Sequence, residues 1–251
     1  MKAFLLFTLI LVVISADRAN AKEITFTAAD GVLLYADIYT QPKPEQAANI
    51  ILFHQGGGNV RAEYELIWPT LFELGYNILA VDMRNGGSER LGGQNRTVNK
   101  LGEKKYSYCE AQVDVIPSIQ QLKSMGLNGP IILWGSSFSA ALVINTTAEL
   151  SGQIAGTLAF SPASGGPLAD CSPNKHANAI SSPLMILRPQ REMEIESVQK
   201  QFKLFTDAGH ITFVAKDGVH GSSMLNPNRV TGDVDSTWAA VKNFLNSIDG
   251  K

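Results

Sequence analysis

The sequence predicts an α/β protein, with a mostly parallel central sheet of about eight strands and helices on both of its faces. Strand-like apolar segments alternate with helix-like segments from residue 23 onward, which is typical of sheets built from βαβ units. Most strand-like segments are short continuous apolar runs, as expected of strands buried on both faces. The chain has 251 residues, 45% of them hydrophobic, and no linker or internal repeat divides it. We therefore expect one domain over residues 22–251.

Two local patterns predict the individual strands. Residues 23–28 and 32–39, joined by the Asp30-Gly31 turn, are typical of a β-hairpin. The remaining strands are predicted from apolar runs bounded by turn residues. They are expected at residues 49–53, 77–81, 130–134, 154–160, 184–187 and 211–215.

The segments between these strands carry helix signals. Pro69 suits the first turn of a helix that Gly75 ends. Pro117 lies inside another helical segment, where a kink is expected. Further helices are expected at residues 109–125, 138–150, 197–208 and 236–248. Two stretches, residues 84–108 and 161–182, are too long for simple turns, so we expect ordered loops with a functional role there.

The N-terminal segment is typical of a secretory signal peptide. Lys2 provides a positive start, residues 3–14 are apolar apart from Thr8, and Ala19-Asn20-Ala21 matches an A-x-A cleavage site. The alternative, an uncleaved membrane anchor, is disfavoured because a span needs roughly 20 apolar residues. We expect residues 1–21 to be removed, which would leave an exported protein, periplasmic or secreted, without stable membrane association.

The charge pattern argues against nucleic acid as a partner. The formal net charge is −2, and no long run of Lys or Arg occurs. Nucleic-acid binding needs a concentrated basic surface that neutralises phosphates. We therefore expect no nucleic-acid partner.

The two cysteines, Cys109 and Cys171, are expected to form a disulfide, because exported proteins fold in an oxidising compartment. Each lies in or beside one of the two long loops, so the bond would tie those loops together over a common site. The alternative is a pair of buried reduced thiols.

The sharpest local signal is the segment LWGSSFSAA at residues 133–141, where an apolar strand ends at Gly135 and a small-residue helix begins after Ser137. It resembles the nucleophile elbow of the α/β-hydrolase superfamily, G-x-S-x-G, with Ser139 in place of the last glycine. The resemblance implies that Ser137 is the nucleophile and that the Phe138 N–H, at a helix N-terminus, is one donor to an oxyanion. Taken alone, the pattern also fits an ordinary small-residue turn.

A second segment, IILFHQGGG at residues 50–58, is an apolar strand that runs into His54 and then into glycines. It resembles the oxyanion loop of the same superfamily, which usually begins His-Gly. Gln55 stands in place of that glycine, so the second oxyanion donor is left open between the Gln55 N–H and the Gly56 N–H. A phosphate-binding loop is disfavoured, because no Lys-Ser or Lys-Thr follows the glycines.

The candidate base is His220, which follows the last predicted strand and precedes a glycine, as the catalytic histidine of the superfamily does. The other histidines lack this placement. His54 is expected to be structural in the oxyanion loop, His176 has no motif around it, and His210 begins a strand.

The candidate acid departs from the family pattern. The superfamily usually places an aspartate after the strand that precedes the histidine strand, and Glu192 stands about there, with Glu194 as the nearby alternative. Glutamate can orient an imidazole as aspartate does, and the chain order Ser, acid, His is retained. Both glutamates can instead belong to a solvated helix start, in which case Asp170 is the next candidate.

Together these motifs resemble the α/β-hydrolase superfamily over nearly all of residues 22–251. The resemblance looks closest to the lidless dienelactone-hydrolase-like branch, because residues 161–182 are too few for a helical cap. It implies a three-layer fold and hydrolysis of a small-molecule ester through an acyl-enzyme, with no metal or organic cofactor. Ser137 would attack, His220 would take its proton and Glu192 would orient His220. A prolyl-oligopeptidase-like peptidase, a thioesterase and a non-catalytic binding protein of this fold are the alternatives.

Overall fold

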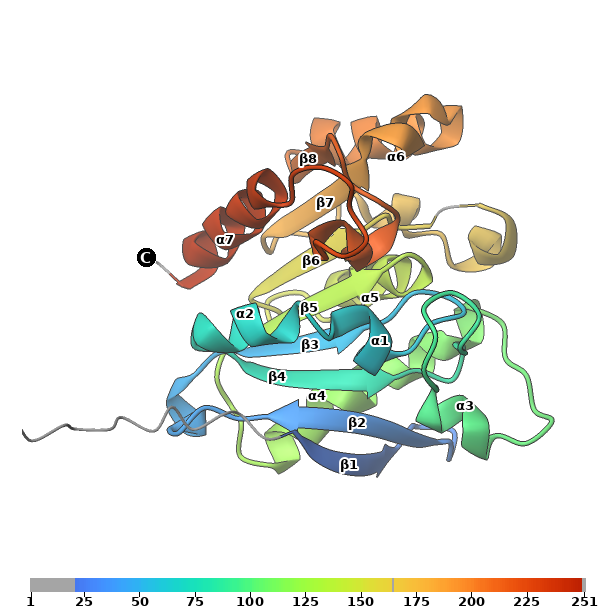
Figure 1. The fold of residues 1–251 in the computed structure, drawn as a ribbon, viewed down its shortest axis with the longest axis vertical. Helices are drawn as coiled ribbons and strands as arrows, with labels where there is room; N and C mark the ends of the chain where they lie inside the picture. Colours follow the sequence, from blue (N-terminus) through green and yellow to red (C-terminus); the bar gives the residue numbers. More distant parts are fainter. Residues whose placement is uncertain (1–20, 164, 250–251) are drawn as a thin grey trace, which may run out of the picture.

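An eight-stranded sheet with the order β1-β2-β4-β3-β5-β6-β7-β8 forms the centre of the computed structural model (Figure 1). β1 pairs antiparallel with β2, and β2 pairs antiparallel with β4, whereas all the other neighbours are parallel. The strands are β1 Lys22–Thr27, β2 Leu33–Tyr39, β3 Asn49–Phe53, β4 Asn77–Asp82, β5 Ile131–Ser136, β6 Gly156–Phe160, β7 Leu184–Pro189 and β8 Ile211–Ala215. The predicted fold class, a mostly parallel sheet led by a hairpin, is confirmed.

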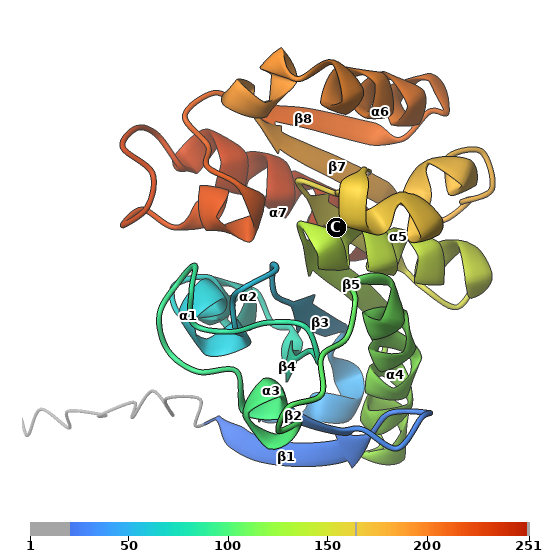
Figure 2. The same cartoon turned by 90° about the vertical axis from the view of Figure 1, so that its right-hand side faces the viewer.

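Helices cover both faces of this sheet, which gives three layers. The α-helices of the described residues are α1 Val60–Tyr64, α2 Trp68–Glu73, α3 Arg96–Lys100, α4 Val115–Ser124, α5 Phe138–Glu149, α6 Glu196–Asp207 and α7 Asp235–Asp249. The 3-10 helices are η1 Pro44–Gln46, η2 Cys109–Asp114, η3 Gly166–Cys171, η4 Pro173–His176, η5 Gln190–Glu194 and η6 Gly221–Leu225. Figure 2 shows α1, α2 and α7 on one side of the sheet and α4 and α5 on the other, the side on which α6 also packs.

The central strands supply the core on both faces. Along β5, Ile131 and Leu133 point into the layer of α4 and α5, whereas Ile132 and Trp134 point into the layer of α1, α2 and α7. All four side chains are buried, which explains why this strand is a continuous apolar run. Burying each such side chain contributes about 1.5–3 kcal/mol to the free energy of folding.

The segment predicted as one helix over residues 109–125 is two helices. The 3-10 helix η2 covers Cys109–Asp114, and the α-helix α4 begins only at Val115. Pro117 thus falls in the first turn of α4. Backbone N–H groups of the first turn have no acceptor within the helix, so the N–H that proline lacks breaks no helical hydrogen bond. The expected kink inside a long helix was therefore wrong.

A disulfide joins η2 to η3 at Cys109 and Cys171, with their Cα atoms 5.6 Å apart. The predicted pairing is confirmed, and it connects the two long loops near the carboxyl edge of the sheet. Between β6 and β7 the described chain forms only the short helices η3 and η4, in line with the expected lack of a helical cap.

The structure describes residues 21–163 and 165–249. The expected signal peptide, residues 1–21, lies outside the described residues except for Ala21. Within the described ranges, no helix is long and apolar enough to span a lipid bilayer.

Candidate active site

Ser137 occupies the tight turn between β5 and α5. Its backbone has φ 61° and ψ −114°, a strained conformation that residues with a side chain rarely adopt. The residue two positions earlier has to be glycine, because a Cβ on Gly135 would come within 2.5 Å of Ala140 Cα. Helix α5 therefore starts directly behind the strand, and Ser137 stands partly exposed at the carboxyl edge of the sheet.

Ser139, which replaces the last glycine of the elbow pattern, is buried and hydrogen-bonded. Its Oγ accepts a hydrogen bond from the Ser136 N–H (2.8 Å) and lies 2.8 Å from Phe53 O, an acceptor at the end of β3. The hydroxyl thus fastens the elbow to the neighbouring strand. The departure from the family pattern is accommodated by these bonds.

His220 and Glu192 come together from the ends of β8 and β7. His220 Nδ1 lies 2.5 Å from Glu192 Oε1, and the His220 side chain is half exposed while that of Glu192 is only 15% exposed. Glu194, two residues further on, is exposed and has no hydrogen bond to His220 among the described residues. Asp170 lies in η3 and is also exposed.

The surroundings of Glu192 keep it ionised. Its Oε1 also accepts a hydrogen bond from Ser161 Oγ (3.0 Å), and its Oε2 accepts one from Arg188 Nη1 (2.7 Å). Burial raises the pKa of Glu192, but the hydrogen bond with His220 and the charge of Arg188 outweigh burial, and the pKa lies below its ordinary value. A charged carboxylate on Nδ1 holds the imidazole with Nε2 available as a base.

The loop that carries His220 packs on the elbow that carries Ser137. The Ser222 N–H donates to Ser136 Oγ (2.9 Å), and a Cβ on Gly221 would lie 2.3 Å from the same oxygen. Gly221 has φ +68°, so glycine is required there for conformation as well as for space. No hydrogen bond joins Ser137 Oγ to His220 among the described residues. Contacts of this kind are often long before substrate binds.

The oxyanion loop follows β3. The Gln55 N–H donates to Glu63 Oε2 (2.7 Å), so this N–H is already used within the fold. The Gly56 N–H has no acceptor among the described residues, which makes it the better placed of the two alternatives. On the other side, Phe138 begins α5, and the N–H groups of the first helical turn lack partners within the helix.

Tyr108 is a candidate site residue that the sequence patterns do not reveal. Its hydroxyl lies so close to the oxyanion loop that a Cβ on Gly56 would come within 2.5 Å of it. Its ring stacks on Phe138, with centroids 4.7 Å apart. Tyr108 therefore contacts the oxyanion loop with its hydroxyl and the Phe138 side chain with its ring, and the neighbouring Cys109 anchors it through the disulfide.

His54 is structural, as its position in the loop predicts. It is completely buried, its Nδ1 lies 2.8 Å from Gln55 O, and its Nε2 accepts the Met83 N–H (2.9 Å). Burial lowers the pKa of His54, so the ring is neutral and braces the oxyanion loop against the end of β4. His210 precedes β8 and lies at the opposite end of that strand from His220.

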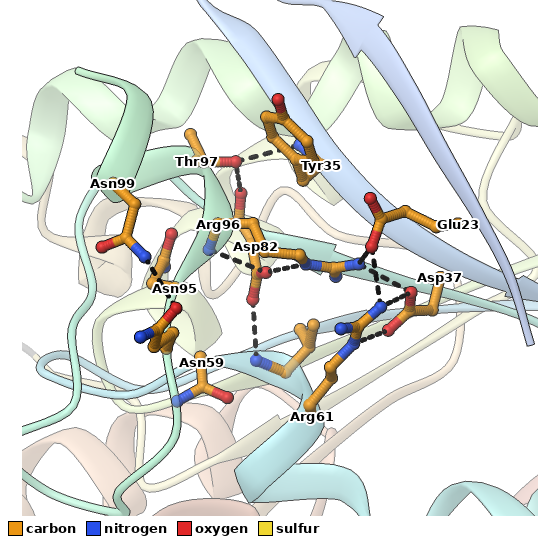
Figure 3. A network of polar contacts seen from close by, with 12 residues as sticks. Glu23, Tyr35, Asp37, Asn59, Arg61, Asp82, Asn95, Arg96, Thr97 and Asn99 are labelled. Atoms are coloured by element: carbon orange, nitrogen blue, oxygen red, sulfur yellow. Dashed lines mark hydrogen bonds and ion pairs between the residues drawn. The ribbon is translucent and has the colours of Figure 1, made fainter.

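Two arginines, Arg61 of α1 and Arg96 of α3, converge on Asp37 of β2 (Figure 3). Arg96 Nε also binds Asp82 Oδ2 (2.6 Å), and the other oxygen of Asp82 accepts the Val60 N–H at the start of α1 (3.0 Å). Both aspartates are buried, and buried carboxylates require such pairing. The network fixes the two short helices against the carboxyl ends of the strands.

A cavity of about 400 Å³ adjoins the candidate base. Its lining includes His220, Glu192, Val219 and the exposed side chain of Ile195. A larger hollow of about 660 Å³ lies at α1 and α2 and is lined by none of the candidate catalytic residues. Within the described ranges, no three His, Cys, Asp or Glu side chains are grouped so that they would hold a metal ion.

A mostly parallel sheet covered on both faces, with a serine elbow after β5 and a histidine after β8, defines the α/β-hydrolase fold. Esterase Pf2001 of Pyrococcus furiosus has a TM-score of 0.68 and 19% identity over 91% of this chain and 90% of its own. Esterase Est22 has a TM-score of 0.67 and 12% identity over 92% and 81%. The acylaminoacyl peptidase of Pyrococcus horikoshii has a TM-score of 0.61 and 16% identity, over 86% of this chain but 40% of its own.

These likenesses establish the fold of the chain. No family model matches the sequence, and no curated protein is significantly similar to it.

Proposed function

We propose that this protein is an exported serine hydrolase that cleaves small carboxylic esters through an acyl-enzyme. The observation that carries the proposal is the 2.5 Å contact between His220 Nδ1 and Glu192 Oε1, on a loop that is hydrogen-bonded to the strained serine elbow. Perturbed backbone conformations and carboxylate–imidazole pairs gather at functional sites. Ser137 supplies the nucleophile, His220 the base and Glu192 the orienting acid.

The reaction follows from these roles. Ser137 Oγ attacks the ester carbonyl while His220 Nε2 takes the hydroxyl proton, and Glu192 stabilises the imidazolium that forms. The N–H groups of Phe138 and Gly56 bind the oxyanion, and each such donor is worth about 3 to 4 kcal/mol of transition-state stabilisation. His220 then protonates the leaving alcohol, and a water molecule activated by His220 releases the acid in the second half-reaction.

Esters of modest size are the substrate class that we favour over peptides. The likeness to the two esterases spans most of both chains, whereas the peptidase is covered over only 40% of its length. Among the described residues, the connection between β6 and β7 forms only the short 3-10 helices η3 and η4 and no helical cap. A small ester reaches such a site without movement of a cap.

Labelling with a fluorophosphonate and turnover of p-nitrophenyl esters, from acetyl to long acyl, test the proposal. The wild-type chain should be labelled once, and Ser137→Ala should abolish labelling and hydrolysis while its circular dichroism spectrum is unchanged. Ser124→Ala, at an exposed serine of α4, is the matched control. Panels of peptides and thioesters, assayed alongside the esters, distinguish an esterase from a peptidase or a thioesterase. A folded chain that the fluorophosphonate never labels would be a binding protein.

Export forms a separate part of the proposal and has its own test. The disulfide and the A-x-A site ending at Ala21 support it. The N-terminal sequence of protein recovered outside the cytoplasm should begin at Lys22. Recovery of the chain with residues 1–21 still attached would indicate an anchor instead.

A further inference from the structure

Glu63 of α1 is a fully buried carboxylate that has no part in the mechanism above. It has no ion pair within the described residues, although burying a carboxylate without a cation is costly. Three hydrogen-bond donors surround it instead: the Gln55 N–H at 2.7 Å from Oε2, and Ser136 Oγ at 2.5 Å and Gln55 Nε2 at 3.5 Å from Oε1. The burial of this carboxylate is therefore explained by the segments of the fold that its hydrogen bonds hold together.

The donors to Glu63 come from segments that carry the reacting groups. Gln55 precedes Gly56 in the oxyanion loop, and Ser136 precedes the nucleophile Ser137. Ser136 Oγ in turn accepts the Ser222 N–H (2.9 Å), two residues after the base. A continuous chain of hydrogen bonds therefore runs from the oxyanion loop through Glu63 and the elbow to the histidine loop.

We propose that Glu63 is a positioning residue for the reaction, whose ionised carboxylate fastens the oxyanion loop to the nucleophile elbow and, through Ser136, to the histidine loop. The inference rests on the proposed function in that it takes Ser137, His220 and Gly56 as the reacting groups. With the Gln55 N–H fixed on Glu63, the next N–H along the loop, that of Gly56, is the one left free for the oxyanion.

The donors around Glu63 suit the ionised form, in which both carboxylate oxygens accept. Ser136 Oγ accepts from the Ser222 N–H and donates its single proton to Glu63 Oε1. If Glu63 carried a proton on Oε1, the two hydroxyl groups would compete as donors and the Ser136 proton would lose its acceptor. A protonated Glu63 therefore holds the elbow less firmly.

Glu63 changes from its protonated to its ionised form near neutral pH. Burial raises the pKa of Glu63 to about 7, although the hydrogen bonds from Ser136 and Gln55 and the charges of His220 and Arg229 lower it. The other ionisable groups on the packed elements are Arg61 and Tyr64 on the same helix, His54 at the end of β3, and Asp82 of β4, which binds the start of that helix. The buried Tyr64 hydroxyl donates to Phe53 O and stays neutral.

Ester hydrolysis by Glu63→Gln, measured against pH, tests the inference. Glutamine keeps the shape of the side chain and imitates the protonated acid, so kcat at pH 8.5 should fall about ten- to a hundredfold with KM little changed. At pH 5.5 the wild-type residue is itself protonated, so the ratio of the two kcat values should approach one. Glu65→Gln, at an exposed residue just past α1, is the control and should match the wild type at both pH values.

A role limited to packing would give the same ratio at both pH values. A constant ratio, or equal kcat values at pH 8.5, would overturn the inference. Hydrogen–deuterium exchange gives a readout that needs no catalysis: Glu63→Gln at pH 8.5 should speed exchange in both residues 54–58 and residues 220–223. If the wild type neither reacts with fluorophosphonate nor turns over ester, the proposed function fails but the structural role of Glu63 does not. In that case unchanged exchange in both segments would overturn the role of Glu63.

Discussion

Glutamine in place of Glu63 should stabilise the protein at alkaline pH, although it replaces a side chain that is hydrogen-bonded at both oxygens. Burial raises the pKa of Glu63 to about 7 from its ordinary 4.5. One pKa unit corresponds to about 1.4 kcal/mol, so ionised Glu63 makes the fold about 3 kcal/mol less stable than an unperturbed carboxylate would. The glutamine variant has no charge to bury, and its amide can still accept from Gln55 and donate to Ser136.

The sign of the pH dependence follows from proton linkage. Between pH 4.5 and about 7 the folded state holds a proton on Glu63 that the unfolded chain has released. The stabilisation is complete below this window and is lost as pH rises through it. The free energy of unfolding of Glu63→Gln, minus that of the wild type, should therefore increase by about 3 kcal/mol between pH 4.5 and pH 8.5.

Urea unfolding at several pH values, with the disulfide intact, measures this difference. Subtraction at each pH removes the contribution of titrating groups that the two proteins share. Glu65→Gln should show a flat difference, because Glu65 is exposed. A difference for Glu63→Gln that is constant within about 0.5 kcal/mol, or that falls with pH, would refute the reasoning.

Three further outcomes are expected. Glu192→Gln should lower kcat for esters by about 10⁴ and Glu194→Gln by less than about tenfold, because only the first contacts the candidate base; the reverse ranking would move the role to Glu194. Tyr108→Phe should lower kcat by about tenfold at unchanged Tm, since its hydroxyl lies against the oxyanion loop; an unaltered kcat would exclude it from the site. Alkylation without reduction should leave the intact mass unchanged, whereas labelled Cys109 and Cys171 would contradict the disulfide. Reduction of the disulfide should lower the free energy of unfolding by about 2–4 kcal/mol.

The larger elements could be predicted because each has a pattern of its own. The strand at residues 211–215 was predicted with its observed bounds, and β5 extends only two residues beyond the predicted end, to Ser136. Residues 131–134 of β5 are apolar because this strand is buried on both faces, whereas β8 is a partly exposed edge strand in which Thr212 interrupts the apolar run. The elbow and the residues around His220 are local as well, since a strand, a glycine and a helix start stand next to one another in the sequence.

Short helices and buried charges escaped prediction because their causes are distant in the sequence. Helices α1 and α3 are too short for apolar periodicity, and Asn59 and Asn95 cap them while ion pairs hold them in place. Glu63 reads as a surface residue, since glutamate is seldom fully buried. Ser136, one of its hydrogen-bond donors, is 73 residues away in the sequence and reaches it only in the folded chain.

The position of β1 at one edge of the sheet has a practical consequence for attachment. Strand pairing sets Lys22 level with Leu133 of β5, through Ile38, Leu79 and Ile51. Lys22 is therefore four strands from β5 in the sheet order, or about 19 Å at the usual strand spacing. Ser137 lies a further four residues along the strand direction. A tether joined ahead of Lys22 thus attaches well away from the nucleophile, and the protein can be immobilised on a support by this end with its reacting edge open to substrate.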